Sequence, residues 1–235
     1  MITSFPSSTA APPRPVAVDL YRDIHKGIRA ELFAVTEEAG RADAAQNGDR
    51  AALVDHVRSL VWLLTSHSEH EDGAIQPVLE QRLPDLARRV AADHDAIEAR
   101  LATLADLATA TVDVDAIEAR AGVHALYGEL ASFTAAYLHH QDVEERVVMP
   151  SLEAEIGVDA TAGIHQAIIG SIPPDEMARS LALMLPAMNV DYRVELLGGM
   201  RDGAPADAFQ AVWSLAGSVL APADHAVLAR RLDLA

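Results

Sequence analysis

Residues 53–78 read LVDHVRSLVWLLTSHSEHEDGAIQPV and carry the most informative pattern in the chain. Apolar residues recur in this stretch at intervals of three and four, which is the spacing of one face of an amphipathic α-helix. His67 and Glu71 fall on the same stripe, at positions where buried apolar residues are expected. The pattern therefore predicts a long helix that directs two polar side chains toward the protein interior.

The same arrangement returns further along the chain as His140-Gln-Asp-Val-Glu144. A proline follows the glutamate six residues later in both copies, as Pro77 and as Pro150. Residues four apart on a helix are neighbours, with Cβ atoms about 5–6 Å apart, so the two side chains of each pair can converge on one cation. Each copy therefore predicts half of a metal site.

Apolar periodicity predicts four long helices, and the aromatic content of 4% also favours helices over a β-sandwich or barrel. The helices are expected from near Val18 to about Ala45, from Asp49 to about Val78, from Pro84 to about Ala108, and from about Asp115 to Glu155. Short connections between long helices make them antiparallel neighbours. The fold class is therefore expected to be all-α, an up-down-up-down four-helix bundle.

Residues that cap or break helices predict how the chain is divided further. Asn47-Gly48-Asp49 is expected to end the first helix and cap the second. Residues 1–16 are predicted to form a flexible arm, 17–156 the bundle, and 157–235 a C-terminal group of shorter helices. We expect this extension to act as a lid or as a homodimerisation element. The residues expected to start, kink or break its helices are Pro173-Pro174, Pro186, Gly198-Gly199, Asp202-Gly203, Pro205 and Pro222.

Composition excludes several classes of function. A net charge of −17 would repel a nucleic-acid backbone or an anionic membrane surface. No apolar stretch approaches the roughly 18 residues of a membrane span, and no secretion signal is evident, so we expect a cytoplasmic protein. The chain has no cysteine, which excludes disulfides, thiolate metal sites and thiol catalysis. Any bound metal must therefore be held by histidine and carboxylate.

Each of the other two long helices supplies one further histidine on its apolar stripe, His25 on the first and His94 on the third. Four imidazoles and two carboxylates are too many ligands for one tetrahedral zinc. They suit two ions bridged by both carboxylates, with positions left for a shared oxo or hydroxo group and an incoming molecule. Imidazole with carboxylate suits iron. The Glu-x-x-His pairs of ferritin-like di-iron sites are absent. The predicted metal ligands are His25, His67, Glu71, His94, His140 and Glu144.

From about Val18 to Glu155, these residues and their spacing resemble the hemerythrin-like HHE cation-binding family. The resemblance implies a non-haem di-iron centre with Glu71 and Glu144 as bridges. Oxygen-carrying hemerythrins have a second histidine one turn after the third-helix histidine, whereas this chain has Glu98 there. The set of four histidines and two carboxylates is similar instead to repair-of-iron-centres and related bacterial proteins. Those repair proteins usually carry an N-terminal domain with cysteines, which this chain lacks.

Several functions are compatible with such a centre. The first is binding or turnover of a small oxidant, namely oxygen, peroxide or nitric oxide, with peroxide or nitric oxide decomposition as the possible enzymatic activity. The second is iron storage or donation for iron-centre repair. A third is an oxygen or redox sensor that acts through the C-terminal helices, and a fourth is an acidic adaptor in which metal is incidental.

The remaining candidate residues have structural interpretations beside functional ones. Glu98 fits a seventh ligand or a solvated residue, Tyr21 a redox relay or a core residue, and His56 an access path or the edge of the core. His70 and His139 lie off the inner stripes and are expected on the surface or behind the ligands. The residues interpreted as structural are His124, His165, His225 and the stripe of Met177, Leu181, Met184, Leu185 and Met188.

Overall fold

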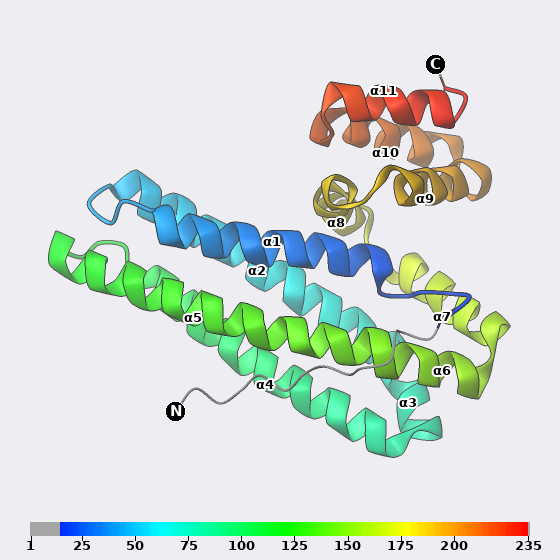
Figure 1. The fold of residues 1–235 in the computed structure, drawn as a ribbon, viewed down its shortest axis with the longest axis horizontal. Helices are drawn as coiled ribbons and strands as arrows, with labels where there is room; N and C mark the ends of the chain where they lie inside the picture. The colour runs from blue at the N-terminus through cyan, green and yellow to red at the C-terminus, as the bar shows by residue number, and fades with distance from the viewer. Residues whose placement is uncertain (1–14, 235) are drawn as a thin grey trace.

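The computed structural model describes residues 15–234, and no strand occurs in this part of the chain. Four long helices run along one another (Figure 1). Their bounds are α1 Arg22–Arg41, α2 Asn47–Ala74, α4 Pro84–Thr109 and α5 Ala116–Val143. Helix α1 packs against α2 and α5, and α4 packs against the same two helices. The predicted up-down-up-down bundle is confirmed.

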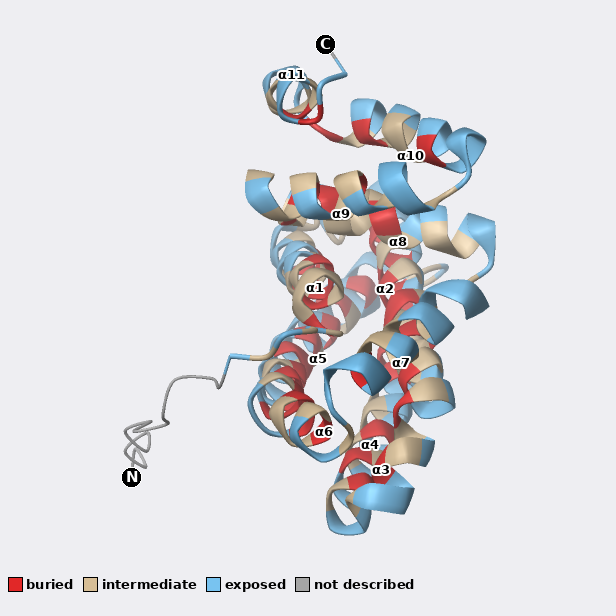
Figure 2. Cartoon of the chain, turned by 90° about the vertical axis from the view of Figure 1, so that its right-hand side faces the viewer, coloured by how far each residue is buried: buried red, intermediate tan, exposed pale blue. Residues whose placement is uncertain are grey.

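The interior of the bundle contains two apolar clusters of buried residues, and buried residues are drawn in red in Figure 2. The larger cluster includes Leu32, Leu60 and Leu130, and the smaller one includes Leu79 and Leu152. All five of these leucines have no exposed surface. Burying a leucine side chain contributes about 1.5–3 kcal/mol, so each cluster stabilises the part of the bundle that it occupies.

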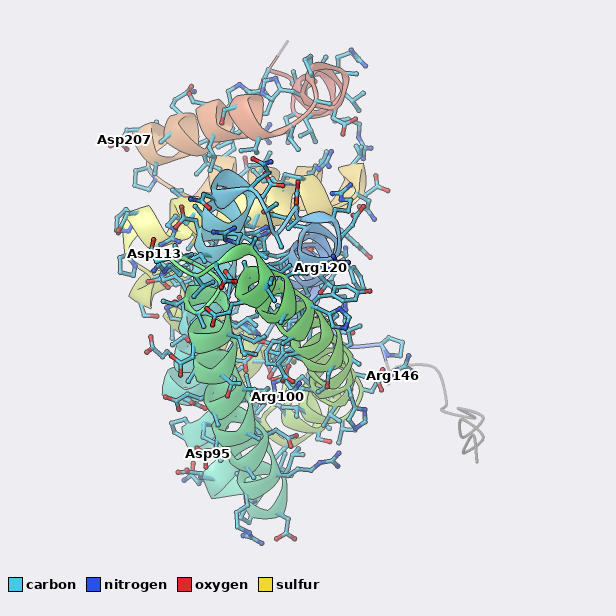
Figure 3. The ribbon with its side chains drawn as sticks, turned by 90° about the vertical axis from the view of Figure 1, so that its left-hand side faces the viewer. Asp95, Arg100, Asp113, Arg120, Arg146 and Asp207 are labelled. Carbon is cyan, nitrogen blue, oxygen red and sulfur yellow. The ribbon has the colours of Figure 1, made fainter. Side chains whose placement is uncertain are left out.

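The outer surface of the bundle carries ion pairs between neighbouring helices. Arg100 of α4, which is labelled in Figure 3, donates a hydrogen bond from Nε to Glu129 of α5 at 3.0 Å. Half-buried surface pairs of this kind contribute on the order of 1 kcal/mol, so the buried leucines account for more of the stability.

The first two helices differ from their predicted bounds. Helix α1 begins at Arg22 and not near Val18, because Asp19 accepts hydrogen bonds from the backbone N–H groups of Tyr21 and Arg22. Asn47 does not cap α2: it is the first helical residue, and its side chain accepts a hydrogen bond from Arg50 at 2.6 Å. Asp49 instead accepts one from the N–H of Asp43 in the connection.

Each proline after a His–Glu pair follows an interruption of regular α-helix. Helix α2 ends at Ala74, before the predicted Val78, and α3 (Gln76–Arg82) has Pro77 in its first turn. Helix α5 passes into a π-helical turn, η1 (Glu144–Val148), before α6 (Met149–Ile156), which has Pro150 in its first turn. Proline lacks the N–H that a continuous helix requires. The prediction of uninterrupted helices through both stretches was therefore wrong.

The C-terminal extension begins with α7 (Val158–Ser171), which packs on α2, and α8 (Pro174–Ala187), which packs along α1 (Figure 1). Gly27 of α1 permits close approach, since a Cβ there would lie 3.3 Å from the backbone of Met184. Helices α9 (Val190–Gly203), α10 (Ala206–Val219) and α11 (Pro222–Arg231) form a separate apolar cluster with α8.

Most of the predicted helix boundaries in the extension are confirmed, but α9 runs through Gly198-Gly199 without a break. Of the predicted N-terminal arm, residues 1–14 lie outside the described residues. Ala17 and Val18 donate backbone hydrogen bonds to Glu153 of α6. None of the helices among the described residues has the length and apolar character needed to cross a membrane.

His56 joins α1 to α2 and gives a first test of the fold. Its hydrogen bond with Glu31, together with that to Glu38, raises the pKa of the imidazole from 6.5 to about 9. A raised folded-state pKa stabilises the protein fully below the unfolded value and less as pH rises through the folded value. We therefore expect the free energy of unfolding of the metal-free protein to fall by about 1–2 kcal/mol between pH 6 and pH 10 through this group, after allowance for solvent screening.

Urea unfolding at the two pH values measures this loss. His56→Gln should remove that part of the pH dependence, whereas substitution of the exposed His124 by glutamine should leave it in place. An unchanged pH dependence in His56→Gln would contradict the assignment.

Candidate metal centre

The six predicted ligands lie together in the layer between the two apolar clusters. They come from all four long helices and the π turn: His25 from α1, His67 and Glu71 from α2, His94 from α4, His140 from α5, and Glu144 from η1. None of the six is more than 9% exposed. The amphipathic spacing therefore placed every one of these side chains inside the bundle.

The two glutamates each lie between two histidines. Oε1 of Glu71 lies 3.1 Å from Nε2 of His67, and its Oε2 lies 3.3 Å from Nε2 of His94. Oε2 of Glu144 lies 3.4 Å from Nε2 of His25, and its Oε1 lies 3.1 Å from Nε2 of His140. Each carboxylate thus directs one oxygen to the pair formed by His25 and His67, and the other oxygen to the pair formed by His94 and His140.

The side chains fall into two overlapping groups, and within each the potential ligand atoms lie within 4.8 Å of one another. One group contains His25 and His67, and the other contains His94 and His140; Glu71 and Glu144 belong to both. The histidine rings meet edge to face within each pair, with centroids 5.3 and 5.1 Å apart. Each group could hold a metal ion, and the two groups share both carboxylates.

Several of these atoms are buried without a hydrogen-bond partner. They include Nε2 of His25, His67 and His94 and both carboxylate oxygens of Glu144. A buried polar group without a partner costs free energy, and a buried charge costs more unless it is paired or bound to metal. The unpartnered atoms all face the same space, so the donor set fits metal cations in both positions.

The pKa values in the metal-free state reflect this crowding. Burial raises the pKa of Glu71 well above its ordinary value, and the neighbouring Glu144 adds to the effect. Burial also lowers the pKa of His67 to about 3. The pKa of His94 is lowered by burial but raised more strongly by Glu144 and Glu71, to about 11. Metal binding requires neutral imidazoles and ionised carboxylates, so cations would have to displace protons from this cluster.

Two further carboxylates hold the outer nitrogens of the histidines. Glu145 contacts Nδ1 of His25 at 2.9 Å, and Asp72 contacts Nδ1 of His94 at 2.8 Å. A carboxylate that accepts a hydrogen bond from Nδ1–H directs the lone pair of Nε2 toward a metal. Sequence analysis did not identify either residue, although each directly follows one of the two glutamates.

In the π turn, as in the regular helix α2, consecutive residues contact the two nitrogens of one histidine ring. Side chains of neighbouring residues diverge by about 100° around a regular α-helix. At the start of η1, Glu144 faces Nε2 of His25 while Glu145 faces Nδ1 of the same ring. Such π turns are frequent at functional sites.

Removing these outer contacts should weaken metal binding without removing a ligand. We expect Glu145→Gln and Asp72→Asn each to lower metal affinity about 10–100-fold. Competitive titration against a chelator measures the change. Asp95→Asn, on the exposed face of α4, is the matched control and should bind as the unmodified protein does. Equal affinity in all four proteins would show that the outer carboxylates do not position the histidines.

The other predicted residues occupy different places. Tyr21 is buried beside the centre, with its ring centroid 4.9 Å from that of His25, and burial raises its pKa so that the hydroxyl stays protonated. Glu98 and His139 are exposed, and His56 pairs with glutamates away from the centre. His70 lies behind His67 and pairs with Glu176 of α8 at 3.3 Å.

The remaining three histidines lie outside the centre. His124 is exposed, and His225 packs against Trp213 in the extension, with ring centroids 4.2 Å apart. His165 of α7 is half-buried, and burial lowers its pKa. None of the three belongs to either group of potential ligands.

Comparison with known proteins agrees with this geometry. The family model described as the hemerythrin HHE cation binding domain matches residues 16–152, more than half of the chain. The matched region covers the four long helices and all six clustered side chains. Searches of curated proteins and of solved structures found no significant match. From the family match, the chain is a member of the hemerythrin HHE cation-binding domain family.

Proposed function

We propose that the six clustered side chains hold two iron ions and that this centre binds or turns over a small oxidant such as oxygen, peroxide or nitric oxide. The observation that carries the proposal is the placement of each glutamate between both histidine pairs. A carboxylate with its two oxygens on different imidazoles is arranged to bridge two ions.

The donor set supports iron in particular. In each position an ion would meet two imidazole nitrogens and two carboxylate oxygens. This mixture suits iron, and octahedral coordination would leave about two positions per ion for non-protein ligands. When bound, the iron pair would supply electrons and open coordination sites to the oxidant.

The surrounding residues would tune the centre. Glu145 and Asp72 would orient His25 and His94 and add negative charge behind them. The buried hydroxyphenyl rings of Tyr21 and Tyr137 lie against His25 and His140, with ring centroids 4.9 and 5.5 Å apart, and would keep bulk water from these sides. The apolar clusters above and below would do the same along the bundle axis.

Anaerobic titration with Fe(II), followed by exposure to oxygen, tests the proposal. We expect two irons per chain and a new charge-transfer absorption after oxidation. His140→Ala should reduce the stoichiometry from two irons to one and lose the charge-transfer absorption, whereas His139→Ala, which alters the adjacent exposed histidine, should keep both. Fewer than two irons per chain in the unmodified protein, or equal binding in both variants, would contradict a di-iron centre.

Two further measurements separate the functions compatible with the centre. Oxygen evolution from hydrogen peroxide would identify peroxide decomposition. Iron that a chelator strips within minutes would favour storage or donation for iron-centre repair.

The division of the chain is also part of the proposal. Residues 17–156 would form the metal-binding unit, and the extension 157–235 would act as a lid over its α1–α2 side. A cytoplasmic location and a homodimer formed through the C-terminal helices stay predictions.

A further inference from the structure

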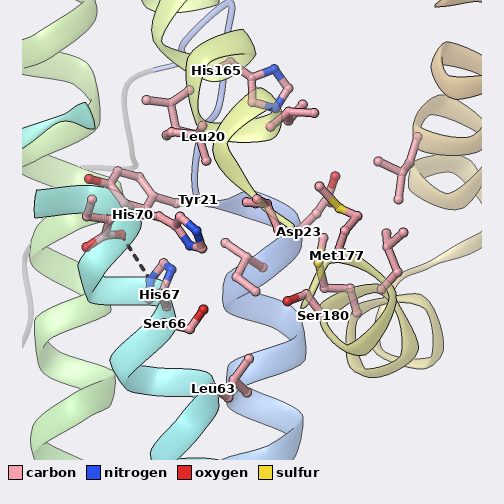
Figure 4. A pocket seen from close by; sticks show the side chains of 18 of the residues that line it. Leu20, Tyr21, Asp23, Leu63, Ser66, His67, His70, His165, Met177 and Ser180 are labelled. Carbon is pink, nitrogen blue, oxygen red and sulfur yellow. Dashed lines mark ion pairs between the residues drawn. The ribbon is translucent and has the colours of Figure 1, made fainter. Parts of the chain in front are cut away.

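A cavity of about 370 Å³ lies between the bundle and the C-terminal extension (Figure 4). Its walls come from α1, α2, α7 and α8, with a contribution from α9. Most of the lining side chains are apolar, among them Leu63, Ile168, Ile172, Met177 and Leu181. Small-molecule sites typically have volumes of about 300–1,000 Å³ and mostly apolar walls, so both size and lining are those of a ligand site.

One wall of this cavity belongs to the candidate metal centre. His67, Glu71 and Tyr21 line it, and Figure 4 shows His67 and Tyr21 on the bundle side, opposite Met177 and Ser180 of α8. A molecule in the cavity would therefore lie directly against His67, one member of the first histidine pair. The apolar walls and the polar end together resemble the arrangement in which a few polar groups orient a mainly apolar ligand.

The extension is fastened to the bundle at the edge of the cavity. Glu176 of α8 accepts a hydrogen bond from Ser66, which directly precedes His67 on α2, and pairs with His70, which lies three residues after it. One turn further along α8, the guanidinium of Arg179 lies 3.4 Å from the centroid of the Trp62 ring. These contacts hold α8 in place without filling the space behind it.

The charges around the cavity indicate the class of ligand. Its described lining contains no lysine or arginine that would pair with an anion. The carboxylate of Asp19 accepts two backbone hydrogen bonds, and that of Asp23 pairs with Arg22, so neither is free to bind a cation. A neutral molecule fits these walls better than a charged one.

The lining side chains support a ligand site. Methionine side chains adapt to ligands of irregular shape, and three of them, Met177, Met184 and Met200, line this cavity. We propose that the cavity binds one neutral, mainly apolar organic molecule next to the metal centre, and that the C-terminal extension forms its outer wall.

Fluorescence titration of the metal-free, full-length protein with the neutral probe N-phenyl-1-naphthylamine tests this inference. Metal-free protein is used so that the result does not depend on the proposed iron centre. We expect saturable enhancement with one probe per chain. Ser180→Phe and Met177→Trp each place an aromatic ring in the cavity and should lower the affinity for the probe at least about tenfold. Ala178→Phe adds the same ring to the exposed face of α8 and should leave the affinity unchanged.

The outcomes are distinguishable. Absence of saturable binding would overturn the proposal, as would binding that persists in both Ser180→Phe and Met177→Trp. An equal loss in Ala178→Phe would also overturn it, because the effect would then come from α8 and not from the cavity. Two blocking variants are used so that one that fails to fold, as judged by circular dichroism, leaves the other to decide.

Discussion

Substitution of Glu144 by alanine is expected to abolish binding of both metal ions. Its two oxygens contact His25 on one side and His140 on the other, so one change removes a ligand from each position. The loss should exceed about a hundredfold in affinity for each ion, because the imidazoles and Glu71 would then hold the cations with only one of the two shared carboxylates. Isothermal titration with Fe(II) under anaerobic conditions measures both stoichiometry and affinity.

A second variant makes this prediction specific to bridging. His25→Ala removes a ligand from only one of the two groups, so it should reduce the stoichiometry from two ions to one. Glu155→Ala, an exposed carboxylate on α6, should bind two ions as the unmodified protein does. Retention of one tightly bound ion in Glu144→Ala would show that this carboxylate serves a single position.

Removal of the metal is expected to lower the thermal stability by about 15–30 °C. An ion that binds only the folded state stabilises it by about 4 kcal/mol at a thousand times its dissociation constant, and two ions would contribute about twice that. A chain of this size shifts by roughly 2–4 °C for each kcal/mol. The metal-free protein also retains buried polar atoms without partners, such as Nε2 of His67.

Differential scanning calorimetry of chelator-treated and reloaded protein measures the shift. The Glu144→Ala variant should melt at the same temperature with and without added metal. Equal melting temperatures for the unmodified protein in the two states would mean that metal binding is incidental to the fold.

The breaks after α2 and α5 could not be predicted from the spacing of apolar residues. Pro77 and Pro150 were visible in the sequence, but their spacing alone does not state whether a helix ends, bends or widens into a π turn. In this chain α2 ends before Pro77, whereas α5 widens into a π turn before Pro150. Glu145 could therefore not be distinguished from an exposed glutamate until His25 was placed beside it.

The cavity could not be predicted from the sequence either, because it is formed by segments that are far apart along the chain. The stripe that includes Met177 and Met184 predicted only an apolar face, without its partner. The packing of α8 along α1, the bond between Glu176 and Ser66, and the space left between them arise from contacts between segments more than a hundred residues apart.

By itself, the sequence determined the helical class and the inward direction of all six clustered side chains, because helical periodicity alone specifies which face a residue occupies. The pairing of His67 with Glu71 and of His140 with Glu144 is equally local. Only the tertiary structure decided which oxygen meets which histidine, which carboxylates support the rings from behind, and where the extension leaves room for a ligand. Those features depend on ångström-scale distances between separate helices, which the spacing of residue types in the sequence does not reveal.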